Sequence, residues 1–222
     1  SVCEPVLIQF TEHDFVVDAL KEIYDYSERE PLNQKDSMSS LLSQLDSTDN
    51  SVHIEKVIEC ISYLILTIES EPDQIEQYFE AINPYLIQLL QTNDTTFCAP
   101  AIFCFSAFAS KCATLVRGFI PQIVEIIISG ASEQDINFND KAATVIQNFV
   151  DIYPRSFAEF CPQVVSALIS IVNDKELYNN MRMASIENYE FYNCSKLTQI
   201  TIQSSITKIG KYTYSSCNNI TQ

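Results

Sequence analysis

Three segments of this chain share one apolar pattern centred on a proline, and this repeat narrows the possible folds more than any other feature. The segments are residues 79–90, 116–127 and 157–168, with Pro84, Pro121 and Pro162 at the matching position. Each has apolar residues two and five before the proline, and two, five and six after it. Proline costs little in the first turn of a helix, because that N–H has no helical partner. The pattern therefore predicts helices that begin near these prolines and recur about every 40 residues.

Second helices are expected between the proline-marked ones, because apolar residues recur there with a period of 3.6. The expected N-caps are Ser51, Asp94 and Asn139, and Gly130 is an expected helix end. Each pair of helices has an apolar face that it cannot bury alone, so about five stacked pairs predict an all-α fold, an α-solenoid. The expected second helices span residues 95–110, 139–153 and 176–190, and the upstream helices span 4–10, 12–27, 34–46 and 51–70.

The chain lacks the residues that most catalytic sites need. Three isolated glycines argue against nucleotide-binding loops, and no GxSxG, Walker, HExxH or GxGxxG motif is present. His13 lies between Glu12 and Asp14, which suggests a general base with an orienting carboxylate. A solvated helix start is the favoured interpretation of His13, and of His53 as well. We therefore expect no enzyme activity, no cofactor and no metal.

The eight cysteines include no CxxC pair and stand mostly in apolar helical runs. They predict reduced core thiols and an intracellular protein. The longest uncharged run, residues 95–110, is shorter than the ~20 residues that span a bilayer and contains Pro100. It predicts a buried helix and no membrane span. The start of the chain has an acid at Glu4 and no basic stretch, so no secretory signal is expected.

The repeat resembles HEAT repeats, an armadillo-like helical class, over about 185 residues. Within that class, residues 153–165 (YPRSFAEFCPQVV) look most like the importin-β (karyopherin) family. The resemblance implies a nuclear transport receptor that shuttles between cytoplasm and nucleus, with second helices lining a concave face that binds basic cargo. It also implies a Ran-type GTPase and phenylalanine-glycine nucleoporins as partners. Another HEAT-type assembly scaffold is an alternative.

After about residue 190 the pattern changes, and a self-comparison at an offset of 23 aligns seven residue pairs, including Cys194 with Cys217. This segment resembles the BspA-type leucine-rich repeat of bacterial and protist surface proteins. We therefore divide the chain into residues 1–188, the HEAT-like α-solenoid, and 189–222, a partial leucine-rich-repeat β segment. The alternative function is a fragment of a surface or adhesion protein. The motif residues are Phe191, Cys194, Leu197, Ile200, Ile202, Ile206, Ile209, Gly210, Tyr214 and Cys217.

The net charge of −16 is concentrated near the start of the chain, where residues 1–92 hold 18 Asp and Glu against 4 Lys and Arg. Such a field repels nucleic acid and anionic lipid and attracts basic partners. An acidic stripe follows a helical face in residues 12–27, and a second acidic cluster follows at residues 69–80. An ordinary solvated face is the alternative to a docking surface for basic cargo. The candidate partner-binding residues are Asp14, Asp18, Glu22, Asp25, Glu69, Glu71, Asp73, Glu76 and Glu80.

Overall fold

The computed structural model describes residues 7, 9, 11–26, 34–69, 71–131, 133 and 135–173. These residues form helices, turns and short connections, and no strand is present among them. The prediction of an all-α fold is confirmed for this part of the chain. The predicted helix at 176–190 and the whole predicted leucine-rich segment, 189–222, lie outside the described residues.

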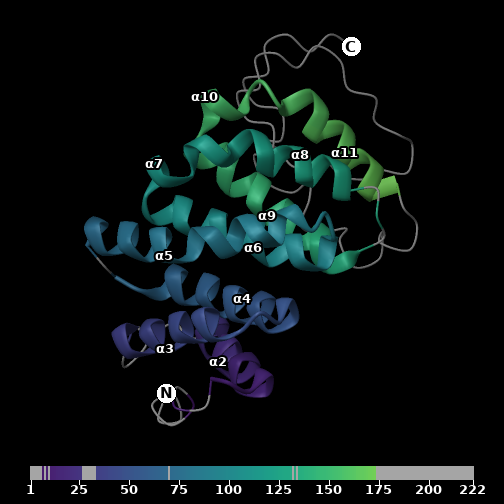
Figure 1. The fold of residues 1–222 in the computed structure, drawn as a ribbon. Coiled ribbons are helices and arrows are strands. Elements are labelled where there is room, and N and C mark those ends of the chain that lie inside the picture. The colour runs from purple at the N-terminus through teal and green to yellow at the C-terminus, as the bar shows by residue number, and fades with distance from the viewer. Residues whose placement is uncertain are drawn as a thin grey trace. The chain divides into compact units, whose positions relative to one another are not determined.

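The chain divides into two compact units, Ser1–Val116 and Arg117–Gln222; Figure 1 labels their helices. The first contains α2 (Asp14–Tyr26), α3 (Gln34–Ser47), α4 (Ser51–Thr67), α5 (Pro72–Gln91), α6 (Thr95–Lys111) and α7 (Ala113–Val116). The second contains a 3-10 turn (Arg117–Phe119), α8 (Ile120–Gly130), α9 (Ile136–Ile152), α10 (Pro154–Phe157) and α11 (Cys161–Asn173).

The helix ends follow local chemistry, with some corrections to the predicted positions. Asp94 caps α6 as predicted, with its carboxylate accepting from the Thr96 N–H at 2.9 Å. The cap of α4 is Asn50 rather than Ser51, and the cap of α9 is Asp135 rather than Asn139. Both corrections have the same reason, since a cap must lie outside the first helical turn to offer its oxygen to the free N–H groups there.

Two of the three repeat prolines stand where they were predicted. Pro121 and Pro162 are each the second residue of their helix, α8 and α11. The prediction for Pro84 is wrong, because α5 begins at Pro72 and continues through Pro84. Pro72 supplies the start signal instead, and Pro84 leaves the carbonyl of Glu80 without its helical donor. The exposed position of Pro84 allows water to satisfy that carbonyl.

In the first unit, contacts recur between residues about 40 positions apart. Tyr85 donates to Asp46 at 2.8 Å, and Lys111 donates to the Ile68 carbonyl at 2.8 Å. The rings of Tyr63 and Phe103 lie 5.2 Å apart. Second helices therefore pack on second helices, α2 on α4 and α4 on α6, and the first helices α3 and α5 touch in the same way.

Helix α6 forms the centre of the first unit. Every residue from Cys98 to Ala109 is buried, so the helix is covered on all sides, as its uncharged sequence predicted. Phe79 of α5 packs edge-on against Phe105 and Phe108 at 6.1 and 5.2 Å between ring centroids. This aromatic group joins α5 to α6 and fixes the pair as one packing element.

In the second unit, α8 packs on α9 and α11, and α10 packs on α9. Gly130, the last residue of α8, has a negative φ, so it is not the left-handed cap that glycine usually supplies. A Cβ at Gly130 would lie 2.5 Å from two ring carbons of the fully buried Phe138. Close approach of α8 to α9 is therefore the reason for glycine at this position.

By length and composition alone, residues Ala113–Gly130 could cross a membrane, with a mean hydropathy of 1.3. The segment is not one continuous α-helix, because the 3-10 turn at Arg117–Phe119 interrupts it. In α8 the buried residues Ile123, Val124 and Ile127 alternate with exposed polar ones, including Glu125. That distribution is typical of a helix that packs one face on a protein core.

The cysteine prediction holds for four described residues. Cys60, Cys98 and Cys104 are free and buried, and Cys112 is free and half-buried. Burial raises the pKa of the Cys104 thiol to about 12 and raises that of Cys60 further, so both stay protonated. Cys161 is the correction, because it is disulfide-bonded.

Candidate functional site

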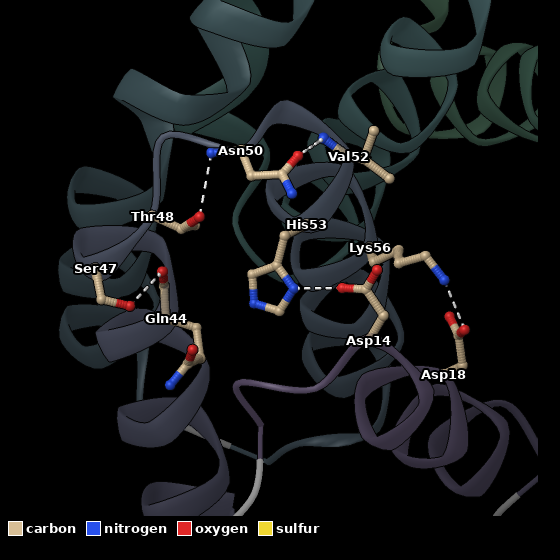
Figure 2. A network of polar contacts seen from close by, with 9 residues as sticks. All are labelled: Asp14, Asp18, Gln44, Ser47, Thr48, Asn50, Val52, His53 and Lys56. Atoms are coloured by element: carbon tan, nitrogen blue, oxygen red, sulfur yellow. Dashed lines mark hydrogen bonds and ion pairs between the residues drawn. The ribbon is translucent and has the colours of Figure 1, made fainter.

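The predicted acidic stripe of α2 lies partly against α4. Asp14 contacts His53 Nδ1 at 2.6 Å, and Asp18 accepts from Lys56 Nζ at 2.6 Å. One turn further on, Lys21 donates to Glu59 at 3.2 Å. The three pairs follow the same order on both helices, so α2 and α4 run parallel (Figure 2 shows the first two). Asp14 and Asp18 are thus engaged within the protein.

Three ionisable groups between the two helices, Lys56, Lys21 and Glu55, have raised pKa values. The hydrogen bond that Lys56 donates to the Asp18 carboxylate raises the pKa of Lys56. Burial acts to lower the pKa of Lys21, but the nearby negative groups, Glu59 foremost and then Asp18, together outweigh it and the net shift is upward. Burial and the nearby Glu59 charge raise the pKa of Glu55 to about 7. The α2–α4 seam therefore holds one carboxylate that titrates near neutral pH.

The other predicted acids are exposed. Glu22 and Asp25 lie on the second half of α2, and no ion pair joins either to the described part of the chain. The same is true of five acids that surround the connection from α4 to α5, which we call the acidic corner. Its members are Glu69, Glu71, Asp73, Glu76 and Glu80.

The acidic corner combines a helix start with a charged face. Asp73 lies in the first turn of α5, where the helix dipole favours negative charge. Asp73, Glu76 and Glu80 are spaced i, i+3 and i+7, which places them on one side of the helix. The structure leaves this side in water, so its carboxylates are accessible to a partner.

A second site was not among the predicted sites. It lies where α2 and α4 begin, at the other end of α4 from the acidic corner. It is a pocket of about 640 Å³ between the start of α2, the end of α3 and the start of α4. Eight of its lining residues are polar or charged, and none of the nine is a lysine or arginine. The lining consists of Glu12, His13, Asp14, Phe15, Gln44, Ser47, Thr48, Asn50 and His53.

His53 corrects the prediction that both histidines are solvated. Its side chain is only 8% exposed, while that of His13 is 54% exposed as expected. In Figure 2 the His53 ring lies between Asp14 on one side and Gln44 on the other. In the neutral imidazole, an Nδ1–H that donates to Asp14 leaves Nε2 as an acceptor.

Nε2 of His53 is buried and has no hydrogen-bond partner. A buried polar group without a partner costs about 1–3 kcal/mol, so a ligand that supplies a donor would recover part of that cost. The sequence suggested that a carboxylate orients the imidazole of His13. In the structure this arrangement occurs at His53 of α4 instead, and the orienting carboxylate is that of Asp14 in α2.

The turn between α3 and α4 holds the pocket wall in place. Thr48 Oγ1 accepts from the Asn50 N–H at 3.1 Å, and Asn50 Oδ1 accepts from the Val52 N–H at 3.1 Å. Ser47 donates to the Gln44 carbonyl at 3.1 Å. The side chains of Ser47, Thr48 and Asn50 are therefore engaged in hydrogen bonds with backbone groups (Figure 2). Glu12, His13, Asp14, Gln44 and His53 remain as the polar groups available to a ligand.

The repeat itself contains the signal that identifies this pair. Asp14 and His53 are 39 residues apart, close to the spacing of the prolines, and so occupy equivalent places in successive second helices. Comparing the chain with itself at that offset would have placed the two together. No group of three or more His, Cys, Asp or Glu in the described residues is arranged to hold a metal ion.

Comparison with known families finds one match. The family model described as "BspA type Leucine rich repeat region (6 copies)" matches residues 170–222. The leucine-rich resemblance of the C-terminal segment is therefore confirmed, and the match begins upstream of the predicted boundary at 189, inside α11. No curated protein and no solved structure matches the chain.

Proposed function

We propose that the chain is a non-enzymatic protein-binding scaffold whose helix pairs form a HEAT-like α-solenoid. The supporting observation is the recurrence of contacts at separations of 38, 39 and 43 residues in the first unit. Parallel second helices at a fixed offset are what stacking of one repeated unit produces. In its specific form, the scaffold is part of an importin-β-like transport receptor that shuttles between cytoplasm and nucleus.

The proposed partner surface is the acidic corner, which binds basic segments of cargo. Its five carboxylates are exposed and form no ion pair with a described cation, unlike Asp14 and Asp18, which are paired with α4. Lys111 lies next to this surface, where its Nζ donates to the Ile68 carbonyl at 2.8 Å. A concentrated negative field attracts Lys- and Arg-rich segments and repels nucleic acid. The Ran-type GTPase and the phenylalanine-glycine nucleoporins belong to the importin-β-like form of this proposal.

The test is fluorescence anisotropy with a labelled Lys/Arg-rich peptide and with a control peptide in which Gln replaces the basic residues. We expect saturable binding of the basic peptide that weakens as salt rises. The double variant Glu76→Gln/Glu80→Gln should weaken it by about two- to thirtyfold.

A matched control removes the same charge elsewhere. Glu125→Gln/Asp140→Asn neutralises two exposed acids of the second unit and should leave binding unchanged. Absence of binding at low salt contradicts the cargo proposal. An equal loss in both double variants contradicts the assignment to the acidic corner.

The leucine-rich match supports a second candidate function, a fragment of a surface or adhesion protein. The disulfide at Cys161 supports it too, because structural disulfides persist in oxidising compartments. Labelling intact cells that express the protein with an impermeant amine reagent separates the two. Labelling before lysis supports the surface protein, and labelling only after lysis supports the intracellular scaffold.

A further inference from the structure

The pocket at the start of α2 and α4 lies at the opposite ends of these helices from the acidic corner, and the proposed function does not use it. We propose that it is a binding site for a cationic group, a guanidinium or an alkylammonium. The site is independent of the acidic corner, so it goes beyond the proposed scaffold function.

The charge of the lining selects the class of ligand. Glu12 and Asp14 contribute two carboxylates, and the described lining holds no lysine or arginine. Each carboxylate faces only a histidine, Glu12 with His13 Nε2 at 3.5 Å and Asp14 with His53 Nδ1 at 2.6 Å. Asp14 contacts His53 through one oxygen and has a second oxygen on the same carboxylate. A ligand with several N–H donors fits such an acceptor-rich lining, and an anion would meet repulsion.

The buried histidine supplies the observation that points to a ligand rather than to a solvated cleft. His53 lines the pocket, its ring is held by Asp14, and its Nε2 has no partner. Because Nε2 is completely buried, a donor reaches it only where the side chains that cover it move aside, and a slender donor needs the smallest movement. The planar N–H fork of a guanidinium, or a single ammonium N–H, meets that requirement.

The rim adds an aromatic platform. Phe15 is 71% exposed, although it stands in the first turn of a well-packed helix. His13 stacks on it with ring centroids 5.5 Å apart and an interplanar angle of 14°. A cation over such a face gains cation–π attraction. Exposure of a large ring beside two carboxylates is therefore accounted for by a cationic ligand.

The two histidines are the only ones in the chain, and both line the pocket. Their imidazole resonances therefore report on this site alone. The experiment titrates the full chain, labelled at histidine, with N-acetyl-arginine methylamide at fixed pH and ionic strength. The uncharged isostere N-acetyl-citrulline methylamide is titrated in parallel.

We expect saturable shifts of both imidazoles with the arginine probe and much smaller shifts with the citrulline probe. Phe15→Ala and Glu12→Gln should each weaken binding by about two- to fivefold. Glu22→Gln removes one charge from the same helix outside the pocket, and it should leave the affinity unchanged.

Three outcomes overturn the proposal. The first is the absence of a saturable shift with the arginine probe. The second is an equal affinity for the citrulline probe, which would show that the pocket recognises shape and neutral hydrogen bonds. The third is an equal loss of affinity in Glu22→Gln and Glu12→Gln, which would show general attraction to an acidic surface.

Discussion

Gly130 illustrates how a single residue sets the distance between two helices. The ring of Phe138 occupies the space that a side chain at 130 would fill, and Phe138 is fully buried. Gly118 stands in a 3-10 turn, and a Cβ at that position would meet no atom within 4 Å. The two glycines therefore differ in what they contribute, although both look alike in the sequence.

Gly130→Ala should destabilise the protein by about 1–3 kcal/mol, because the added methyl overpacks the α8–α9 contact. Gly118→Ala provides the matched control and should change stability by no more than about 0.5 kcal/mol in the destabilising direction. Urea denaturation followed by circular dichroism measures both. Equal midpoints for the two variants would show that Phe138 moves aside at no cost.

Glu55 links stability to pH. Its pKa is raised to about 7 in the folded protein, above the ordinary value of 4.5. Between these values the folded state keeps a proton that the unfolded state has lost, so this group reduces stability as pH rises through the window. Glu55→Gln removes the half-buried charge while keeping the shape of the side chain.

We expect Glu55→Gln to raise the melting temperature relative to the natural chain above pH 7. The difference should be smaller below pH 4.5, where Glu55 is protonated in both states. Differential scanning fluorimetry across that range gives the comparison. A difference that does not change with pH would mean that the variant acts through packing and not through ionisation.

At the scale of the element, the helix ends show which local signals are sufficient. Asp94 caps α6 with a side-chain bond to Thr96, and Asp135 caps α9 with a 3.0 Å bond to the Phe138 N–H. Glu71 stands at the cap position of α5 without such a bond. Its helix starts on Pro72, which needs no cap for its missing N–H.

Asp94→Ala should therefore cost about 0.5–2 kcal/mol of stability, since it leaves the Thr96 N–H without its partner. Glu71→Ala removes an acid from the equivalent cap position and should cost much less. Denaturant midpoints of the two variants make the comparison. Loss of equal size in both would mean that charge near the helix dipole, rather than the side-chain bond, stabilises these helix starts.

At the scale of the whole molecule, the free thiols report on opening of the core. Cys60, Cys98 and Cys104 are completely or almost completely buried, whereas Cys112 lies half-exposed after α6. Burial also raises the pKa of Cys60 and of Cys104, which lowers their thiolate fraction.

Alkylation of the native protein should label Cys112 before the three buried thiols, which should react only as the first unit unfolds. Mass spectrometry of peptides taken at successive times measures the order. Adding urea should accelerate labelling of the three buried thiols together, because they share one core. Rapid native labelling of Cys104 would contradict the burial of α6.

Much of the helical architecture follows from sequence. Residues 34–46, 51–70 and 95–110 were predicted as helices, and α3, α4 and α6 match them to within a few residues. The error at Pro84 has a local cause, because a proline tolerated in an exposed helix interior has the same neighbours as one that starts a helix. The candidate site was predicted only in part. The acids of the acidic corner are exposed, as a partner-binding surface requires, but Asp14 and Asp18 are paired with His53 and Lys56.

The sequence by itself determined where most of the described helices form, which faces are apolar and which residue caps α6. These properties depend on neighbours within one or two turns, so a period of 3.6 and a cap residue suffice. Only the tertiary structure decided that Asp14 holds His53, that Asp18 holds Lys56 and that Phe138 excludes a side chain at Gly130. These contacts depend on how each helix is rotated against its neighbour. That rotation is fixed by the packing of whole faces rather than by any local pattern.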